Sequence, residues 1–144
     1  MSDIPQILIA EDDIDDLELT QRALSRFREG LSTKAFQNGA ALVEYLESLS
    51  RSDPSGAAQP RLLLLDIKMP LMGGLEVLEH LRAQELCVGM PVVIFSSSQE
   101  PRDIVRANAS HVNSFVRKPG DYARYMEVLR QVAAYWLDTN LSRG

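Results

Sequence analysis

Acidic residues follow two apolar runs of this sequence directly, and a serine and a lysine lie at the ends of two others. In chain order they are Glu11 and Asp12 after residues 6–10, Asp66 after 62–65, Ser96 after 91–95 and Lys118 after 112–116. Four leucines in succession before Asp66 lack the alternation of a half-exposed strand and predict a strand buried on both faces. Since ligands gather at the carboxyl ends of parallel strands, we expect these polar residues to meet at one edge of a sheet.

Three carboxylates at one edge would repel one another strongly unless a cation lies among them. Mg2+ prefers carboxylate oxygens, waters and phosphate oxygens, and a lysine adds further positive charge. The pattern therefore favours phosphate chemistry supported by Mg2+. A simpler alternative stays open, because Asp often ends a strand as a local hydrogen-bond acceptor and acids suit a helix start. We assign Asp13, Asp15 and Asp16 only to that helix start.

Apolar runs alternate with amphipathic stretches along the whole chain. The predicted strands cover residues 6–10, 33–36, 62–65, 91–95 and 112–116. The predicted helices include one from Ile14 that stops at Gly30, one capped by Asn38, one around 75–81, one over 101–109 and one from Tyr122 to about Leu137. Residues 50–60 lack periodicity and indicate a flexible surface loop.

This alternation requires crossover connections, which are almost always right-handed and place helices on both faces of a parallel sheet. We predict an α/β fold with a doubly wound five-stranded parallel sheet. Of the two common strand orders, the flavodoxin-like order 2-1-3-4-5 has its switch point between the first and third strands. That order would bring Asp12 and Asp66 together.

Length and composition limit the class of protein. The chain has 144 residues, 45% of them hydrophobic and 24% charged, which predicts one globular domain over 1–144 with its core at about 6–137 and no output domain. A net charge of -5 with scattered basic residues disfavours direct binding of nucleic acid. Without a signal peptide or a membrane-length apolar stretch, we expect a cytoplasmic protein that does not bind membranes. Cys87 is the only cysteine, which excludes an internal disulfide.

Four short motifs resemble those of the receiver domains of bacterial two-component response regulators. They are Leu8–Asp13, Leu65–Gly74, Ile94–Ser97 and Phe115–Pro119, and the resemblance runs from about Gln6 to Leu137. It implies that Asp66 is the phosphoacceptor, which takes a phosphoryl group from a histidine of a sensor kinase. Part of the strand order given above is also implied by this resemblance.

The resemblance implies roles for the residues around Asp66. Asp12 would bind Mg2+ directly, Glu11 would bind it through water, and the backbone carbonyl of Lys68 would supply a further ligand. Lys118 would pair with a phosphoryl oxygen, and the peptide bond between Lys118 and Pro119 would be cis. Glu11 stands where Asp is frequent in the family, and the longer side chain still offers a carboxylate to the cation.

Two further residues would form the switch. Ser96 would donate a hydrogen bond to the phosphoryl group and move with it, and Phe115 would then turn inward. This would change the face made by the fourth helix, the fifth strand and the fifth helix. Thr is frequent at the position of Ser96, and Tyr at that of Phe115. Phe115 also fits a plain core residue, as apolar strand residues usually are.

The last predicted helix carries two apolar rows. The first, which we assign to the sheet, is Tyr122, Met126, Leu129, Ala133 and Trp136, and the second is Tyr125, Val128, Val132 and Tyr135. The second row indicates either a homodimer through helices four and five or a broadly buried terminal helix. The Tyr135–Leu137 ending, the stand-alone length and the long loop before strand three resemble the single-domain regulators associated with bacterial phytochrome kinases. That resemblance implies a bacteriophytochrome as the partner kinase.

The combined prediction is a stand-alone response regulator, a phosphoprotein of phytochrome signalling. It would not be an enzyme, apart from phosphorylating and dephosphorylating itself. One alternative is a receiver-like interaction module that is not phosphorylated, but the joint retention of Asp12, Asp66, Ser96 and Lys118 disfavours it. Another is an aspartyl-phosphate phosphatase. Such enzymes carry a second Asp two residues after the nucleophile, where this sequence has Lys68.

Overall fold

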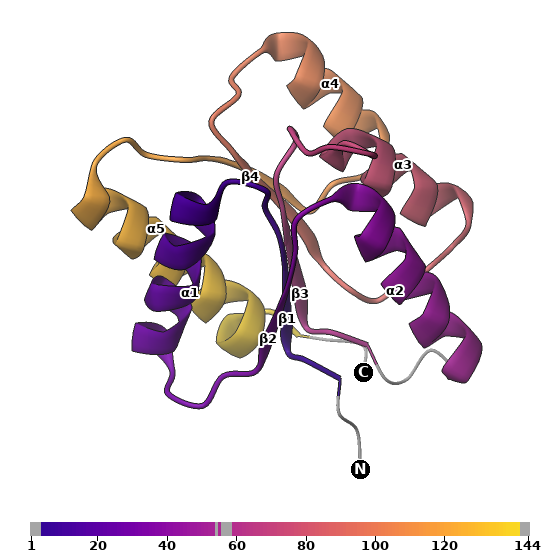
Figure 1. The fold of residues 1–144 in the computed structure, drawn as a ribbon, viewed down its shortest axis with the longest axis horizontal. Coiled ribbons are helices and arrows are strands. Elements are labelled where there is room, and N and C mark those ends of the chain that lie inside the picture. The colour runs from indigo at the N-terminus through magenta and orange to yellow at the C-terminus, as the bar shows by residue number, and fades with distance from the viewer. Residues whose placement is uncertain (1–3, 54, 56–58, 142–144) are drawn as a thin grey trace.

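A parallel sheet of five short strands runs through the centre of the protein (Figure 1). The computed structural model describes residues 4–53, 55 and 59–141. The strands are β1 (Ile7–Ala10), β2 (Thr33–Phe36), β3 (Leu62–Leu65), β4 (Val92–Ser96) and β5 (Ser114–Arg117). All neighbours are parallel and the order is β2-β1-β3-β4-β5. The predicted flavodoxin-like order is confirmed.

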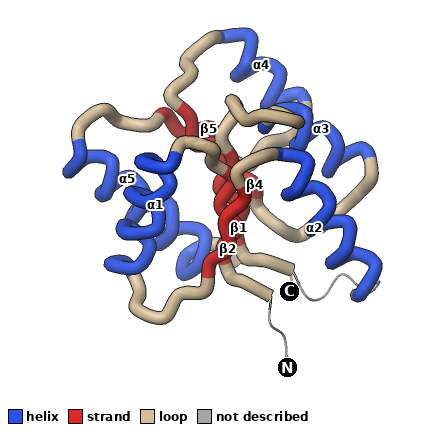
Figure 2. Tube along the Cα trace, viewed as in Figure 1, coloured by secondary structure: helices blue, strands red, loops and turns tan. Residues whose placement is uncertain are grey.

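Helices cover both faces of this sheet. They are α1 (Ile14–Phe27), α2 (Gly39–Ser52), α3 (Gly74–Ala83), α4 (Pro101–Ala109) and α5 (Tyr122–Ala134), which continues as a π-helix, η1 (Tyr135–Thr139). Helices α1 and α5 lie on one face, and α2, α3 and α4 lie on the other (Figures 1 and 2). None of the helices within the described ranges has the length and apolar character needed to cross a bilayer.

Alternating side chains of the central strands supply two separate cores. In β1, Ile7 and Ile9 pack toward α1 and α5, whereas Leu8 and Ala10 pack toward α2 and α3. Every residue of β1, β3 and β4 is buried, as the uninterrupted leucines of β3 predicted. The buried sheet therefore fixes the positions of the side chains that follow its strands.

Asparagine and aspartate side chains fix where three of the helices begin. The carboxylate of Asp13 accepts the backbone N–H of Asp16, Asn38 accepts that of Ala41, and Asp121 accepts that of Arg124. Each bond satisfies a donor that the first turn of a helix leaves free. The prediction that Asn38 caps α2 is confirmed.

Two expectations from the sequence were wrong in detail. Helix α2 extends through Ser52, three residues into the predicted loop, and the rest of that loop lies partly outside the described residues. In α5 it is Tyr125, only 4% exposed, that packs into the core, whereas Tyr122 is 46% exposed. The helix is rotated from the predicted orientation because the Tyr125 ring packs against Phe95 and its hydroxyl contacts Thr20 of α1. Tyr122 is left at the solvent edge.

Candidate functional site

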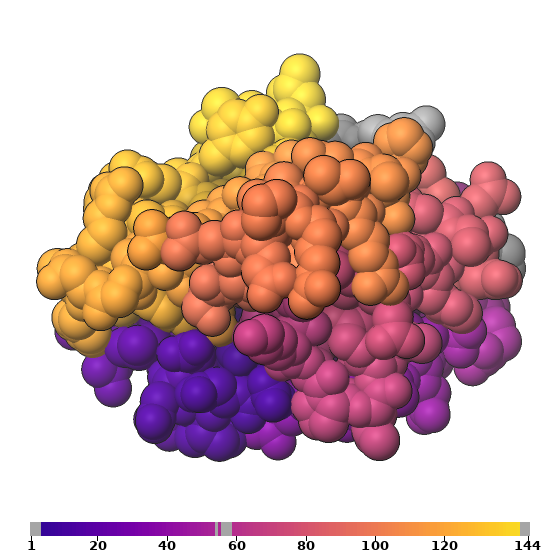
Figure 3. Space-filling view, turned by 90° about the horizontal axis from the view of Figure 1, so that it is seen from above, coloured from indigo at the N-terminus to yellow at the C-terminus, as the bar shows by residue number. Residues whose placement is uncertain are grey.

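The carboxyl ends of β1 and β3 bring two buried acids together. Ala10 pairs with Leu65 in the sheet, so the residues that follow them, Glu11 and Asp66, are neighbours. The backbone N–H of Asp66 also donates to the carbonyl of Ala10 at 3.0 Å. Figure 3 looks onto this edge, where the start of α1, the segment after β3, α4 and the start of α5 share one face.

Glu11, Asp12 and Asp66 form one acidic cluster. Each offers a carboxylate oxygen, and these three oxygens lie within 4.8 Å of one another. Glu11 is 4% exposed and Asp66 8%, whereas Asp12 faces solvent. An all-oxygen set with an open side suits a hard divalent cation that retains water ligands. The predicted meeting of these three residues is confirmed, and the cluster fits a divalent metal ion.

Lys118 reaches the same cluster from the end of β5. Its Nζ lies 2.5 Å from Glu11 Oε1, 2.9 Å from Asp16 Oδ2 and 3.0 Å from Asp66 Oδ2. An ammonium has three donors, so every one of them is used. The predicted cis peptide before Pro119 was wrong, because the described chain contains no cis peptide bond. The trans form is the lower-energy isomer. With this peptide bond trans, the Lys118 side chain still reaches the acidic cluster.

Burial and the neighbouring charges set the protonation of this cluster. Burial raises the pKa of Glu11 to about 8; the hydrogen bond from Lys118 opposes this rise, and the nearby Asp66 reinforces it. For Lys118, burial lowers the pKa, but the hydrogen bonds to Glu11 and Asp16, together with the charges of Asp66 and Glu11, hold the pKa above its ordinary value. Lys118 therefore stays charged while Glu11 binds a proton more tightly than an exposed glutamate does.

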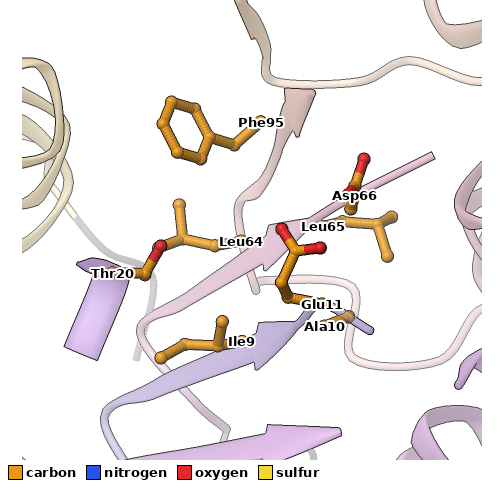
Figure 4. Close-up of a pocket in the computed structure, with 8 residues that line it drawn as sticks. All are labelled: Ile9, Ala10, Glu11, Thr20, Leu64, Leu65, Asp66 and Phe95. Carbon is orange, nitrogen blue, oxygen red and sulfur yellow. The ribbon is translucent and has the colours of Figure 1, made fainter. Parts of the chain in front are cut away.

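A small pocket lies beneath the two buried acids (Figure 4). Its lining combines the carboxylates of Glu11 and Asp66 with a mainly apolar floor of Ile9, Ala10, Leu64, Leu65 and Phe95, and with the hydroxyl of Thr20. In Figure 4 the Glu11 and Asp66 side chains extend from the neighbouring ends of β1 and β3, with the apolar residues around them. The apolar floor keeps the dielectric low on one side of the acids, which strengthens their interaction with Lys118.

Asp16 belongs to this site, although we assigned it only to the helix start. That assignment was wrong, because its carboxylate is an ion-pair partner of Lys118. A signal was present in the sequence. Asp16 stands four residues before the buried Thr20 and eight before the buried Leu24, so it lies on the inward face of α1.

Ser96, Phe115 and Lys68 lie where the strand order predicts, at or near the carboxyl edge. Ser96 is buried, and its Oγ accepts the backbone N–H of Ser98 at 3.2 Å. Phe115 is partly buried against the core beneath α3 and α4. Lys68 is exposed two residues after Asp66. Their roles in metal binding and switching remain predictions.

The loop after β3 is held tightly against the start of α3. Gly74 donates its N–H to the carbonyl of Ile67 at 2.8 Å. A Cβ added to Gly74 would lie 2.0 Å from the carbonyl oxygen of Asp66, which is far inside contact distance. Only glycine lets α3 approach the backbone that carries the Asp66 carboxylate.

We therefore expect Gly74→Ala to destabilise the protein by about 3 kcal/mol, because the backbone of the loop must shift to relieve the overlap. Urea unfolding would measure this loss. Gly120→Ala is the matched control, because a Cβ there meets nothing within 4 Å. The control should change the free energy of unfolding by less than about 1 kcal/mol. Equal stability of the two variants would contradict the close approach of α3 to Asp66.

Comparisons with known proteins agree on one family. The family model described as response regulator receiver domain matches residues 7–130. The probable methanogenesis regulatory protein FilR2 of Methanothrix harundinacea is 31% identical over 138 residues, which are 96% of this chain and 87% of that protein. The structure of the phosphorylated cyanobacterial phytochrome response regulator RcpA has a TM-score of 0.85 at 25% identity, covering 98% of this chain and 99% of that chain. The bacteriophytochrome response regulator RtBRR has a TM-score of 0.69 at 33% identity, covering 96% and 83%.

Proposed function

This chain belongs to the family of response regulator receiver domains, and we propose that it accepts a phosphoryl group on Asp66 from a histidine of a sensor kinase. The observation that carries the proposal is the contact of the Lys118 ammonium with buried Asp66, beside an acidic cluster that fits a divalent cation. The structural similarity to RcpA, which is known in a phosphorylated form, supports it.

In the proposed transfer, a carboxylate oxygen of Asp66 forms a bond to phosphorus while the bond from phosphorus to the histidine nitrogen breaks. The electron pair of that bond stays on the imidazole, which then takes a proton from water. Such transfers need alignment and charge compensation more than covalent help from the protein. Lys118 would compensate charge on one phosphoryl oxygen, and the Ser96 hydroxyl, which only accepts in its bond with Ser98, would donate a hydrogen bond to another.

Glu11, Asp12, Asp66 and the backbone carbonyl of Lys68 would hold the divalent cation, which we take to be Mg2+. When bound, Mg2+ would neutralise part of the negative charge that collects between the acids and the phosphoryl group. The donor set supports this choice, because the clustered side-chain ligands are carboxylates and hard cations prefer oxygen.

The output surface would be the face formed by α4, β5 and α5. Ile104 and Val105 of α4 are exposed apolar residues of this region. We propose that Ser96 and Phe115 alter this face on phosphorylation, and that it supports a homodimer through α4 and α5.

Similarity to RcpA and RtBRR supports a bacteriophytochrome as the partner kinase. We further propose that the chain acts in the cytoplasm as a stand-alone regulator that does not contact nucleic acid directly.

The test of the proposed function is phosphoryl uptake from a small donor. With acetyl phosphate and Mg2+, the intact protein should gain the mass of one phosphoryl group, because Asp66 displaces acetate from phosphorus. With EDTA in place of Mg2+, uptake should stop, since the carboxylates would then repel the anionic donor. Absence of uptake in the presence of Mg2+ would instead favour the interaction module that is not phosphorylated.

A further inference from the structure

We propose that Asp16 is a positioning residue that holds the Lys118 ammonium in place during phosphoryl transfer. This inference deepens the proposed function and rests on it. Asp16 Oδ2 lies 2.9 Å from Lys118 Nζ, and the two residues come from opposite ends of the chain, in α1 and after β5. Of the three partners of Lys118, Asp66 would be the reacting group and Glu11 belongs to the acidic cluster. Asp16 is the partner that takes part in neither.

The first turn of α1 leaves the Asp16 carboxylate free for this role. An acid three residues after a helix cap commonly turns back to the backbone N–H of the capping residue. Here the backbone N–H of Asp13, the cap, donates to Glu11 Oε2 at 3.2 Å instead. The Asp16 backbone N–H donates to Asp13 Oδ1 at 3.0 Å, which fixes the residue in the turn. Its carboxylate is therefore directed to Lys118.

Helix α5 anchors the same residue from the other side. The hydroxyl of Tyr125 donates to the backbone carbonyl of Asp16 at 3.4 Å and lies 3.2 Å from Thr20 Oγ1. Tyr125 is itself buried and packs edge-on against Phe95, with ring centroids 5.2 Å apart. The Asp16 backbone is thus held by α1 and α5 together.

The three acceptors of Lys118 would respond differently to phosphorylation. Formation of the acyl phosphate would remove the carboxylate charge of Asp66 and add phosphoryl oxygens beside Lys118, and Glu11 would be drawn toward the cation. The Asp16 carboxylate keeps its charge, and since its side chain is 32% exposed it retains part of its hydration. The Lys118 side chain is only 7% exposed, so it has little water to replace a lost partner. Asp16 therefore keeps one N–H of the ammonium occupied while the others turn to the phosphoryl oxygens.

The kinetic test compares two acids of the same helical turn. Asp16→Asn should lower the rate constant of phosphorylation by acetyl phosphate with Mg2+ about tenfold, the scale of coupling between contacting charged residues. Asp15→Asn is the matched control, because Asp15 is exposed in the same turn and carries the same charge. It should stay within about twofold of the unchanged protein, and Asp16→Glu should recover most of the rate.

A double-mutant cycle shows whether Asp16 acts through Lys118. In a Lys118→Ala background, Asp16→Asn should cause no further loss of rate, because there is no ammonium left to position. Full additivity of the two losses would overturn the proposal. So would equal rates for the Asp16→Asn and Asp15→Asn variants.

An NMR measurement without cation or phosphate separates this inference from the proposed function. A buried, hydrogen-bonded lysine ammonium exchanges its protons slowly enough to give its own 15N-correlated signal. The Lys118 signal should shift and broaden in Asp16→Asn and stay unchanged in Asp15→Asn. An unaltered Lys118 signal in Asp16→Asn would overturn the positioning role, whereas failure of all variants to accept phosphate would overturn only the proposed function.

Discussion

Asp66→Asn is expected to abolish phosphoryl uptake from acetyl phosphate and Mg2+. The amide oxygen of asparagine is a far weaker nucleophile than a carboxylate, although the side chain has the same shape. It would still accept the backbone N–H of Ile67, which Asp66 Oδ1 accepts at 2.7 Å, so the loop should keep its conformation. Intact-protein mass spectrometry would detect the added phosphoryl group in the unchanged protein and its absence in the variant.

The control for this result is a variant with the same change of charge outside the pocket. Asp15→Asn, on the exposed side of α1, should take up phosphate as the unchanged protein does. Undiminished uptake by Asp66→Asn would mean that a different residue is the acceptor. Peptide mapping of the phosphorylated protein would then identify that residue.

Lys118→Ala is expected to slow phosphorylation by about 10²- to 10³-fold, the usual cost of removing one fixed charged donor from a buried reaction site. The ammonium is in contact with Asp66, so it lies where charge develops on the transferred group. Its removal also leaves Glu11 and Asp66 without their buried countercharge. Single-turnover uptake of acetyl phosphate, followed by mass spectrometry, would measure the rate.

Two further substitutions show whether the rate depends on the position of the Lys118 ammonium or only on its positive charge. Lys34→Ala removes one positive charge from an exposed residue of β2, where Lys34 lies over the rings of Phe36 and Tyr45, and it should leave the rate unchanged. Lys118→Arg keeps the charge but places a planar guanidinium where a compact ammonium fits, so it should remain slow. A normal rate in Lys118→Ala would show that the lysine takes no part in the transfer.

The sequence by itself determined the fold and the centre of the site. Uninterrupted apolar residues, such as the four leucines of β3, predict strands covered on both faces, and their alternation with helices allows few topologies. Parallel strands share a carboxyl edge, so Glu11 and Asp66 had to meet once β1 and β3 were neighbours. The sequence also predicted that Asn38 caps α2, because a helix cap depends only on the residues of the first helical turn.

Only the tertiary structure decided which side chains complete the site. The ion pair of Asp16 with Lys118 joins residues that are 102 positions apart. The rotation of α5 that buries Tyr125 and exposes Tyr122 likewise depends on how that helix packs against α1. The spacing of apolar residues shows that a helix has an inward face. In α5, however, more than one row of apolar residues has that spacing, so the sequence does not say which row is inward. The choice among them depends on contacts with residues distant in the sequence, such as those of Tyr125 with Phe95 and Thr20, which only the folded chain brings together.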